Sequence, residues 1–111
     1  ASAWMISTEA GRDVCAATIA EVIKEMEILR NEPVDQQELD LVRNYMIGSL
    51  LGDLDGPFQL IGRWKSYVLN GLDENYFYKS IETIKSVTPQ ELQSLANTYL
   101  QPDDFYELVV I

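Results

Sequence analysis

Residues 1–111 fit a single domain, and a hydrophobic content of 47% is too high for a disordered chain. Eighteen acidic side chains against eight basic ones give a formal net charge of −10, which disfavours binding to nucleic acids and to anionic membrane surfaces. The chain contains no histidine, so a Ser-His-Asp triad, a Cys-His pair and a histidine-based zinc site are excluded within it.

The cysteine count and the hydropathy exclude further structural features. Cys15 is the only cysteine, so an internal disulfide is excluded. On the apolar face of a helix, a cysteine usually packs as a small buried side chain. No apolar run approaches the roughly 18 residues of a membrane-spanning helix, so the sequence predicts no membrane-spanning segment, and together with the negative charge this predicts no membrane partner. A lone cysteine is compatible with both cytoplasm and periplasm, which leaves the compartment open.

The first part of the chain predicts a short strand followed by a helix. Residues 3–8 alternate in the manner of a strand, and Gly11 then interrupts the pattern. Residues 12–30 carry apolar positions three and four apart, which indicates an amphipathic helix that ends before Pro33. The members of that stripe are Cys15, Ile19, Val22, Met26 and Leu29.

Two further helices are predicted in the middle of the chain. Asp35 precedes an apolar stripe, and Glu38 three residues later completes a capping-box pattern, so a second helix begins here. Glycine, aspartate and proline are concentrated at residues 52–57, which predicts a turn. A third helix is expected over residues 57–70, and Gly71 is a typical stop for it.

The last part of the chain predicts two helices and a strand. Asp73 is placed to cap a fourth helix. Thr88, Pro89 and Glu91 form the strongest local signal, with an N-cap residue, a proline at the first helical position and an acidic partner. The fifth helix ends near residue 102, and residues 105–111 read as a strand covered on both faces.

The order strand, five helices, strand predicts an α+β fold, with the helices packed on one face of a small sheet. Two strands alone make a weak sheet. Either the two strands pair within a dimer, or the missing strands lie upstream in a longer protein. Both ends lie within strand-like sequence, so we favour the second interpretation and expect the chain to be a piece of a larger polypeptide.

Several phrases, spread over almost the whole chain, resemble the pitrilysin/insulinase (inverzincin) family of zinc metallopeptidases. In chain order they are residues 28–39 (ILRNEPVDQQEL), 42–50 (VRNYMIGSL), 70–73 (NGLD) with Tyr76, 84–92 (IKSVTPQEL) and 96–103 (ANTYLQPD). Each phrase alone consists mostly of helix caps and apolar spacing. Their shared order identifies the chain as the later part of the family's second, non-catalytic half-domain.

The resemblance implies a zinc metalloendopeptidase whose other half carries an H-x-x-E-H helix. In that half two histidines and a distant glutamate bind zinc, and the glutamate of the motif activates water. None of these roles can be carried over to a residue of this chain, so no metal or cofactor is expected in it, and zinc is expected in the catalytic half.

The implied role is to complete the peptide-binding chamber and to pack against the catalytic half. The implied partners are that catalytic half-domain or a partner subunit, and a peptide substrate. The alternative is an inactive partner or structural subunit of the same fold, acting as a protein–protein binding module.

No catalytic residue is predicted, and the candidates for binding a peptide are Arg12, Trp64 and Tyr67. Some members of the family grip substrate with an arginine and a tyrosine seven residues later. Arg12 is followed at that spacing by Ile19, which weakens the match. Trp64, Tyr67 and Tyr45 could line a peptide groove, although aromatic residues at helical spacing also form cores.

Overall fold

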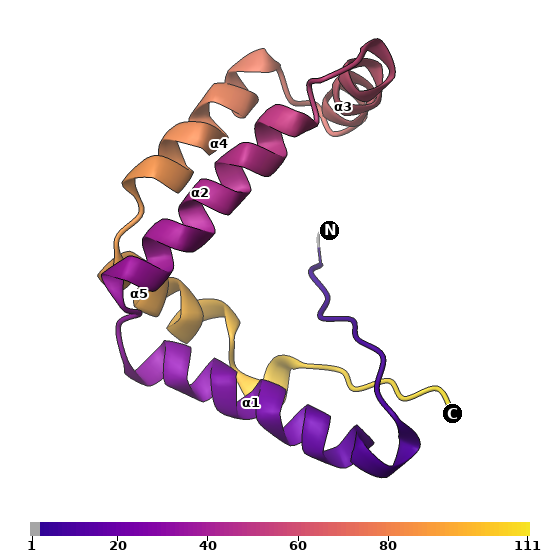
Figure 1. Ribbon diagram of the computed structural model, residues 1–111, viewed down its shortest axis with the longest axis vertical. Coiled ribbons are helices and arrows are strands. Elements are labelled where there is room, and N and C mark those ends of the chain that lie inside the picture. The colour runs from indigo at the N-terminus through magenta and orange to yellow at the C-terminus, as the bar shows by residue number, and fades with distance from the viewer. Residues whose placement is uncertain (1–2) are drawn as a thin grey trace. The chain divides into compact units, whose positions relative to one another are not determined.

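The computed structural model describes residues 3–111, and in that range every regular element is a helix (Figure 1). The elements are η1 Arg12–Val14, α1 Cys15–Asn31, α2 Gln36–Gly52, α3 Pro57–Leu69, α4 Glu74–Ser86, α5 Pro89–Tyr99 and η2 Pro102–Asp104. The five α-helices correspond to the five predicted from periodicity. Within the described range, no helix is both long and apolar enough to cross a membrane.

The prediction of an α+β fold with a small sheet is wrong for this chain. Residues 3–11 and 105–111, expected as strands, have no regular secondary structure, and the described residues contain no strand. A strand requires a hydrogen-bonded neighbour, and the described residues supply none to either segment. The two segments meet through side chains instead, because the Trp4 ring packs edge-on against Phe105 with centroids 4.9 Å apart.

The helix starts follow the predicted caps. The carboxylates of Asp35 and Asp73 each accept a hydrogen bond from the backbone N–H two residues further on, at 2.7 and 3.0 Å. Thr88 and Glu91 form the reciprocal capping box, with hydrogen bonds of 3.2 and 3.0 Å. Gly71 has a φ of +68°, which suits the position after α3 because glycine has no Cβ to clash there.

The chain divides into two compact units. The first comprises the described residues up to Glu32 together with Gln93–Ile111, and the second comprises Pro33–Leu92. The buried apolar side chains of the described residues are Met26 and Ala96 in the first unit and Leu39 and Tyr67 in the second. Each unit therefore has a small core. That residues 1–111 act as one domain stays a prediction.

In the first unit, polar side chains connect the end of α1 to α5 and to the residue after it. The backbone carbonyl of Arg30 accepts hydrogen bonds from the side-chain amides of Gln93 and Asn97, at 3.1 and 2.9 Å. The Arg30 guanidinium donates to the carbonyl of Leu100 at 3.4 Å. The last carbonyls of a helix lack partners within it, so these bonds satisfy an otherwise free acceptor.

In the second unit, α2 and α4 lie side by side, and Arg43 joins them (Figure 1). Its guanidinium donates to the backbone carbonyls of Ile84 and Val87 at 2.9 and 2.6 Å. The same group donates to Asp40, one turn earlier on α2, at 2.8 Å. A cation at the C-terminal end of α4 also complements the helix dipole there.

Candidate functional site

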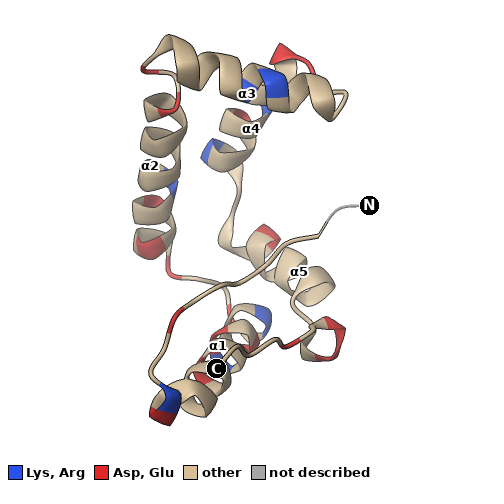
Figure 2. Ribbon diagram, turned by 90° about the vertical axis from the view of Figure 1, so that its right-hand side faces the viewer, with Lys and Arg blue, Asp and Glu red and all other residues tan. Residues whose placement is uncertain are grey.

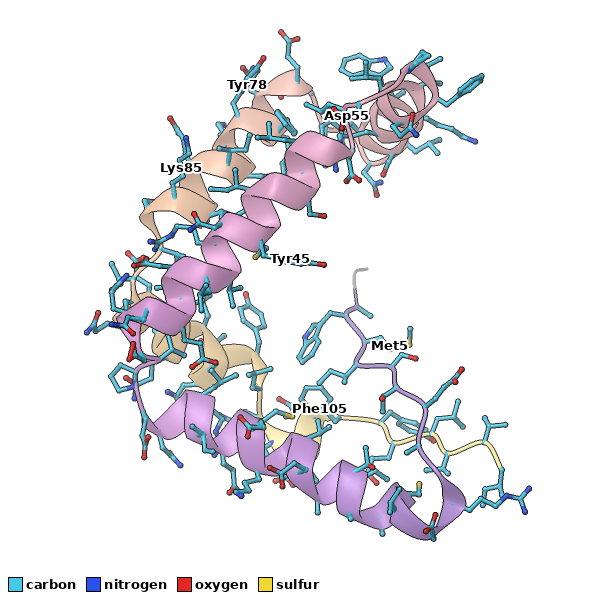
Figure 3. The ribbon with its side chains drawn as sticks, in the orientation of Figure 1. Met5, Tyr45, Asp55, Tyr78, Lys85 and Phe105 are labelled. Carbon is cyan, nitrogen blue, oxygen red and sulfur yellow. The ribbon has the colours of Figure 1, made fainter. Side chains whose placement is uncertain are left out.

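An open groove of about 430 Å³ lies between α3 and α4, within the second unit. We call it the α3–α4 groove. Its walls contain four aromatic rings, those of Trp64, Tyr67, Phe77 and Tyr78, together with three aliphatic side chains. Figure 3 shows Tyr78 on α4, and also Asp55 in the turn before α3. The surface is thus largely apolar, as the surfaces of peptide- and ligand-binding grooves usually are.

Local sequence explains how α3 and α4 come to form these walls. Pro57 occupies the first turn of α3, where its fixed φ favours helix and its missing N–H costs nothing. Asp73 then caps α4 after the Gly71 turn. The Tyr67 and Tyr76 rings pack edge to face with centroids 5.5 Å apart, which fastens α3 to the first turn of α4.

Arg63 is the positively charged member of the groove, and its charge is already engaged. Its guanidinium forms an ion pair with Asp53 and donates to the Tyr67 hydroxyl at 3.4 Å. The guanidinium carbon also lies 5.7 Å from the centre of the Phe77 ring. The hydrogen bond to Tyr67 raises the pKa of Arg63, partial burial opposes this, and the contact with Asp53 raises the pKa further. Arg63 therefore supports the wall as a permanent cation.

Glu74 is the negatively charged member, and its charge is not engaged. The side chain is exposed in the first turn of α4 and lines the groove. Among the described residues no cation lies within ion-pair distance of its carboxylate. An acidic side chain is favoured at this position because the N-terminal end of a helix carries partial positive charge. The groove thus combines aromatic walls with one free carboxylate.

Two of the three residues predicted to bind a peptide come together here. Trp64 and Tyr67 both line the groove, Trp64 half-exposed and Tyr67 buried. Arg12 lies in η1 of the first unit and is exposed. Tyr45, the further aromatic candidate, is exposed on α2 and is not part of the groove lining. Whether any of them contacts a peptide stays a prediction.

The sequence reasoning missed the contribution of α4. Phe77, Tyr78 and Glu74 all line the groove, and none of them is among the binding candidates predicted from the sequence. The available signal was the aromatic run at residues 76–78 directly after a capped helix start. Only the approach of α3 to α4 shows which face of that run meets Trp64.

Residues 3–111 provide no zinc donor set. No cluster of three or more cysteine, aspartate or glutamate side chains that could hold a metal ion occurs among them. The groove itself offers one free carboxylate and no imidazole or thiolate, whereas catalytic zinc sites use three protein ligands. Zinc in the catalytic half of the parent or of a partner stays a prediction.

Comparisons of the chain with the sequence models of known families, with curated proteins and with solved structures found no match. The resemblance to the pitrilysin/insulinase family therefore depends on the ordered sequence phrases alone.

Proposed function

We propose that this chain is a non-catalytic segment of a zinc-dependent metalloendopeptidase of the pitrilysin type. Its role would be to complete the peptide-binding chamber and to pack against the catalytic half. The ordered phrases between residues 28 and 103 support the family assignment. The exposed apolar surface of α3 is the structural observation that supports a packing role.

The α3 helix has an exposed apolar face and a polar side that carries Gln59, Arg63 and Ser66. Phe58, Ile61, Val68 and Leu69 are 84, 65, 59 and 74% exposed, while Tyr67 on another side is buried in the unit core. A contiguous exposed apolar surface of this kind normally marks a site of contact with another protein or domain. Covering each of these side chains would contribute about 1.5–3 kcal/mol to association, before the entropic costs of binding.

The composition also supports a non-catalytic role for this segment. Without histidine, the chain has no usual general base near neutral pH. Cys15, the only thiol, is half-buried and has no imidazole to activate it. A catalytic half elsewhere would supply zinc-bound water, and this segment would supply apolar walls.

The direct test is a quenched-peptide cleavage assay on the full-length protein or complex that contains this chain, with and without a metal chelator. We expect chelator-sensitive cleavage. Stoichiometric zinc binding or unaided cleavage by the 111-residue chain would overturn the proposal. Cleavage-inactive but folded full-length protein would instead favour the inactive partner subunit.

Variants on α3 test the packing role. Replacing Phe58 and Val68 together by serine should reduce cleavage and weaken association with the catalytic half, because apolar contact area is lost. Lys65→Ser, an exposed change on the same helix, is the matched control and should have little effect. Circular dichroism would confirm that both variants keep their helices. Equal cleavage by the two variants would contradict the packing role.

A further inference from the structure

We propose that the α3–α4 groove binds an apolar segment of a partner protein through one lysine or arginine side chain, whose cation contacts Glu74. Every residue that lines the groove belongs to the second unit, so this binding does not depend on the zinc-peptidase proposal.

The charged residues of the groove favour a positively charged group on the bound partner. Arg63 is committed to Asp53 and to the Tyr67 hydroxyl, so no free positive charge remains for an anionic group. Glu74 is the charge left without an ion-pair partner among the described residues. The other cations of these two helices, Lys65, Lys79 and Lys85, do not line the groove. A net charge of −10 on the chain, whose acidic and basic residues are coloured in Figure 2, further favours encounter with basic segments.

The walls suit the rest of a basic side chain. Lysine and arginine place their aliphatic stems on apolar surface while the charged head reaches a polar group. The rings of Trp64, Phe77 and Tyr78 supply that surface. The faces of Trp64 and Tyr78 also attract a cation, whereas the Phe77 ring already lies beside the Arg63 guanidinium. A purely apolar occupant would instead cover the Glu74 carboxylate without compensating it, which is unfavourable.

The size of the groove limits the occupant to a small number of side chains. A volume of about 430 Å³ is in the lower part of the range for ligand sites, which run from roughly 300 to 1,000 Å³. One basic side chain with an apolar neighbour fits this space. We therefore assign the groove to a short apolar segment with a single basic residue.

The test uses three capped peptides of leucine, alanine and serine that differ at one central position: lysine, norleucine or glutamate. The chain has two tryptophans, so Trp4→Phe leaves Trp64 in the groove as the only tryptophan, and its emission is recorded with excitation at a wavelength that tyrosine does not absorb. We expect the lysine peptide to quench Trp64 with about tenfold higher affinity than the norleucine peptide, because aromatic faces and a carboxylate both favour the cation. The glutamate peptide should bind weakest.

Glu74→Gln should strongly reduce the preference for lysine over norleucine, because the lysine peptide loses its anionic partner and the norleucine peptide no longer covers a charge. Glu82→Gln, an exposed carboxylate on α4 outside the groove lining, is the matched control and should keep the preference. Equal affinity for the three peptides, an unchanged preference in Glu74→Gln, or no binding to a chain of native helicity would each overturn the proposal. Trp64 fluorescence that depends on chain concentration without peptide would also overturn it, by showing a second copy in the groove.

Discussion

Within each unit, side-chain hydrogen bonds hold neighbouring helices together, but one acceptor is shared in the first unit and one donor group is shared in the second. In the first unit a single acceptor, the backbone carbonyl of Arg30, receives two side-chain amides from α5. In the second unit a single donor group, the Arg43 guanidinium, serves two backbone carbonyls and a carboxylate. Loss of one amide in the first unit leaves the Arg30 carbonyl with its other donor, whereas loss of Arg43 in the second unit leaves both carbonyls without one. The second unit should therefore be far more sensitive to the loss of one side chain.

Replacing Arg43 by leucine should produce the largest effect. The variant leaves the carbonyls of Ile84 and Val87 without their donor, so we expect unfolding free energy to fall by about 3 kcal/mol. Urea denaturation followed by circular dichroism measures this. Arg43→Lys, which keeps the charge but cannot serve both carbonyls in the same geometry, should lose about half as much. A loss below that of the amide variants described next would refute the comparison.

The paired amides of the first unit should behave non-additively. Gln93→Ala or Asn97→Ala alone should cost about 0.5 kcal/mol, because the Arg30 carbonyl keeps its other partner. The double variant should cost about 1.5 kcal/mol, more than the sum, because that carbonyl then loses both. A double-mutant cycle in urea gives the coupling directly. Strict additivity would show that water replaces each amide independently.

The capping box at the start of α5 should have a smaller and purely local effect. Thr88→Ala removes the hydroxyl that accepts the Glu91 N–H, and we expect a loss of about 1 kcal/mol. Thr88→Ser keeps the acceptor and serves as the control. Thermal unfolding of the three chains makes the comparison, and equal stability of the alanine variant would mean that solvent caps this helix equally well.

The ion pair beside the groove should contribute least. Asp53 is 58% exposed, so Asp53→Asn should cost about 0.5 kcal/mol and less at high salt. The pKa of Arg63 is raised above a value already far from neutrality, so its stabilising contribution persists below that value and is lost only in strong alkali. Between pH 5 and 9 Arg63 should therefore add no pH dependence. Urea midpoints measured at three pH values and two salt concentrations test both statements.

Local signals predicted the helices well because their causes lie within a few residues. Asp35, Asp73 and Thr88 cap helices as expected, since a side chain and the next few N–H groups decide a helix start. The strand predictions failed for the complementary reason. Alternating apolar residues favour an extended backbone, but a strand exists only when a distant segment supplies hydrogen bonds, which the described chain does not.

The residues of the candidate site also differ in whether local sequence could predict them. Trp64 and Tyr67 could be named beforehand because they share one helix at a spacing of three. Glu74, Phe77 and Tyr78 could not, because their role depends on α4 facing α3.

The sequence by itself determined the five helices, their caps and the absence of histidine chemistry, because these depend on residue type and short-range spacing. Only the tertiary structure decided that residues 3–111 form two units in which no sheet is present, and that Arg63 is paired with Asp53 while Glu74 has no ion-pair partner there. Those outcomes depend on which distant groups come within a few ångströms of each other. Coulomb attraction, hydrogen bonding and apolar contact all act at that range.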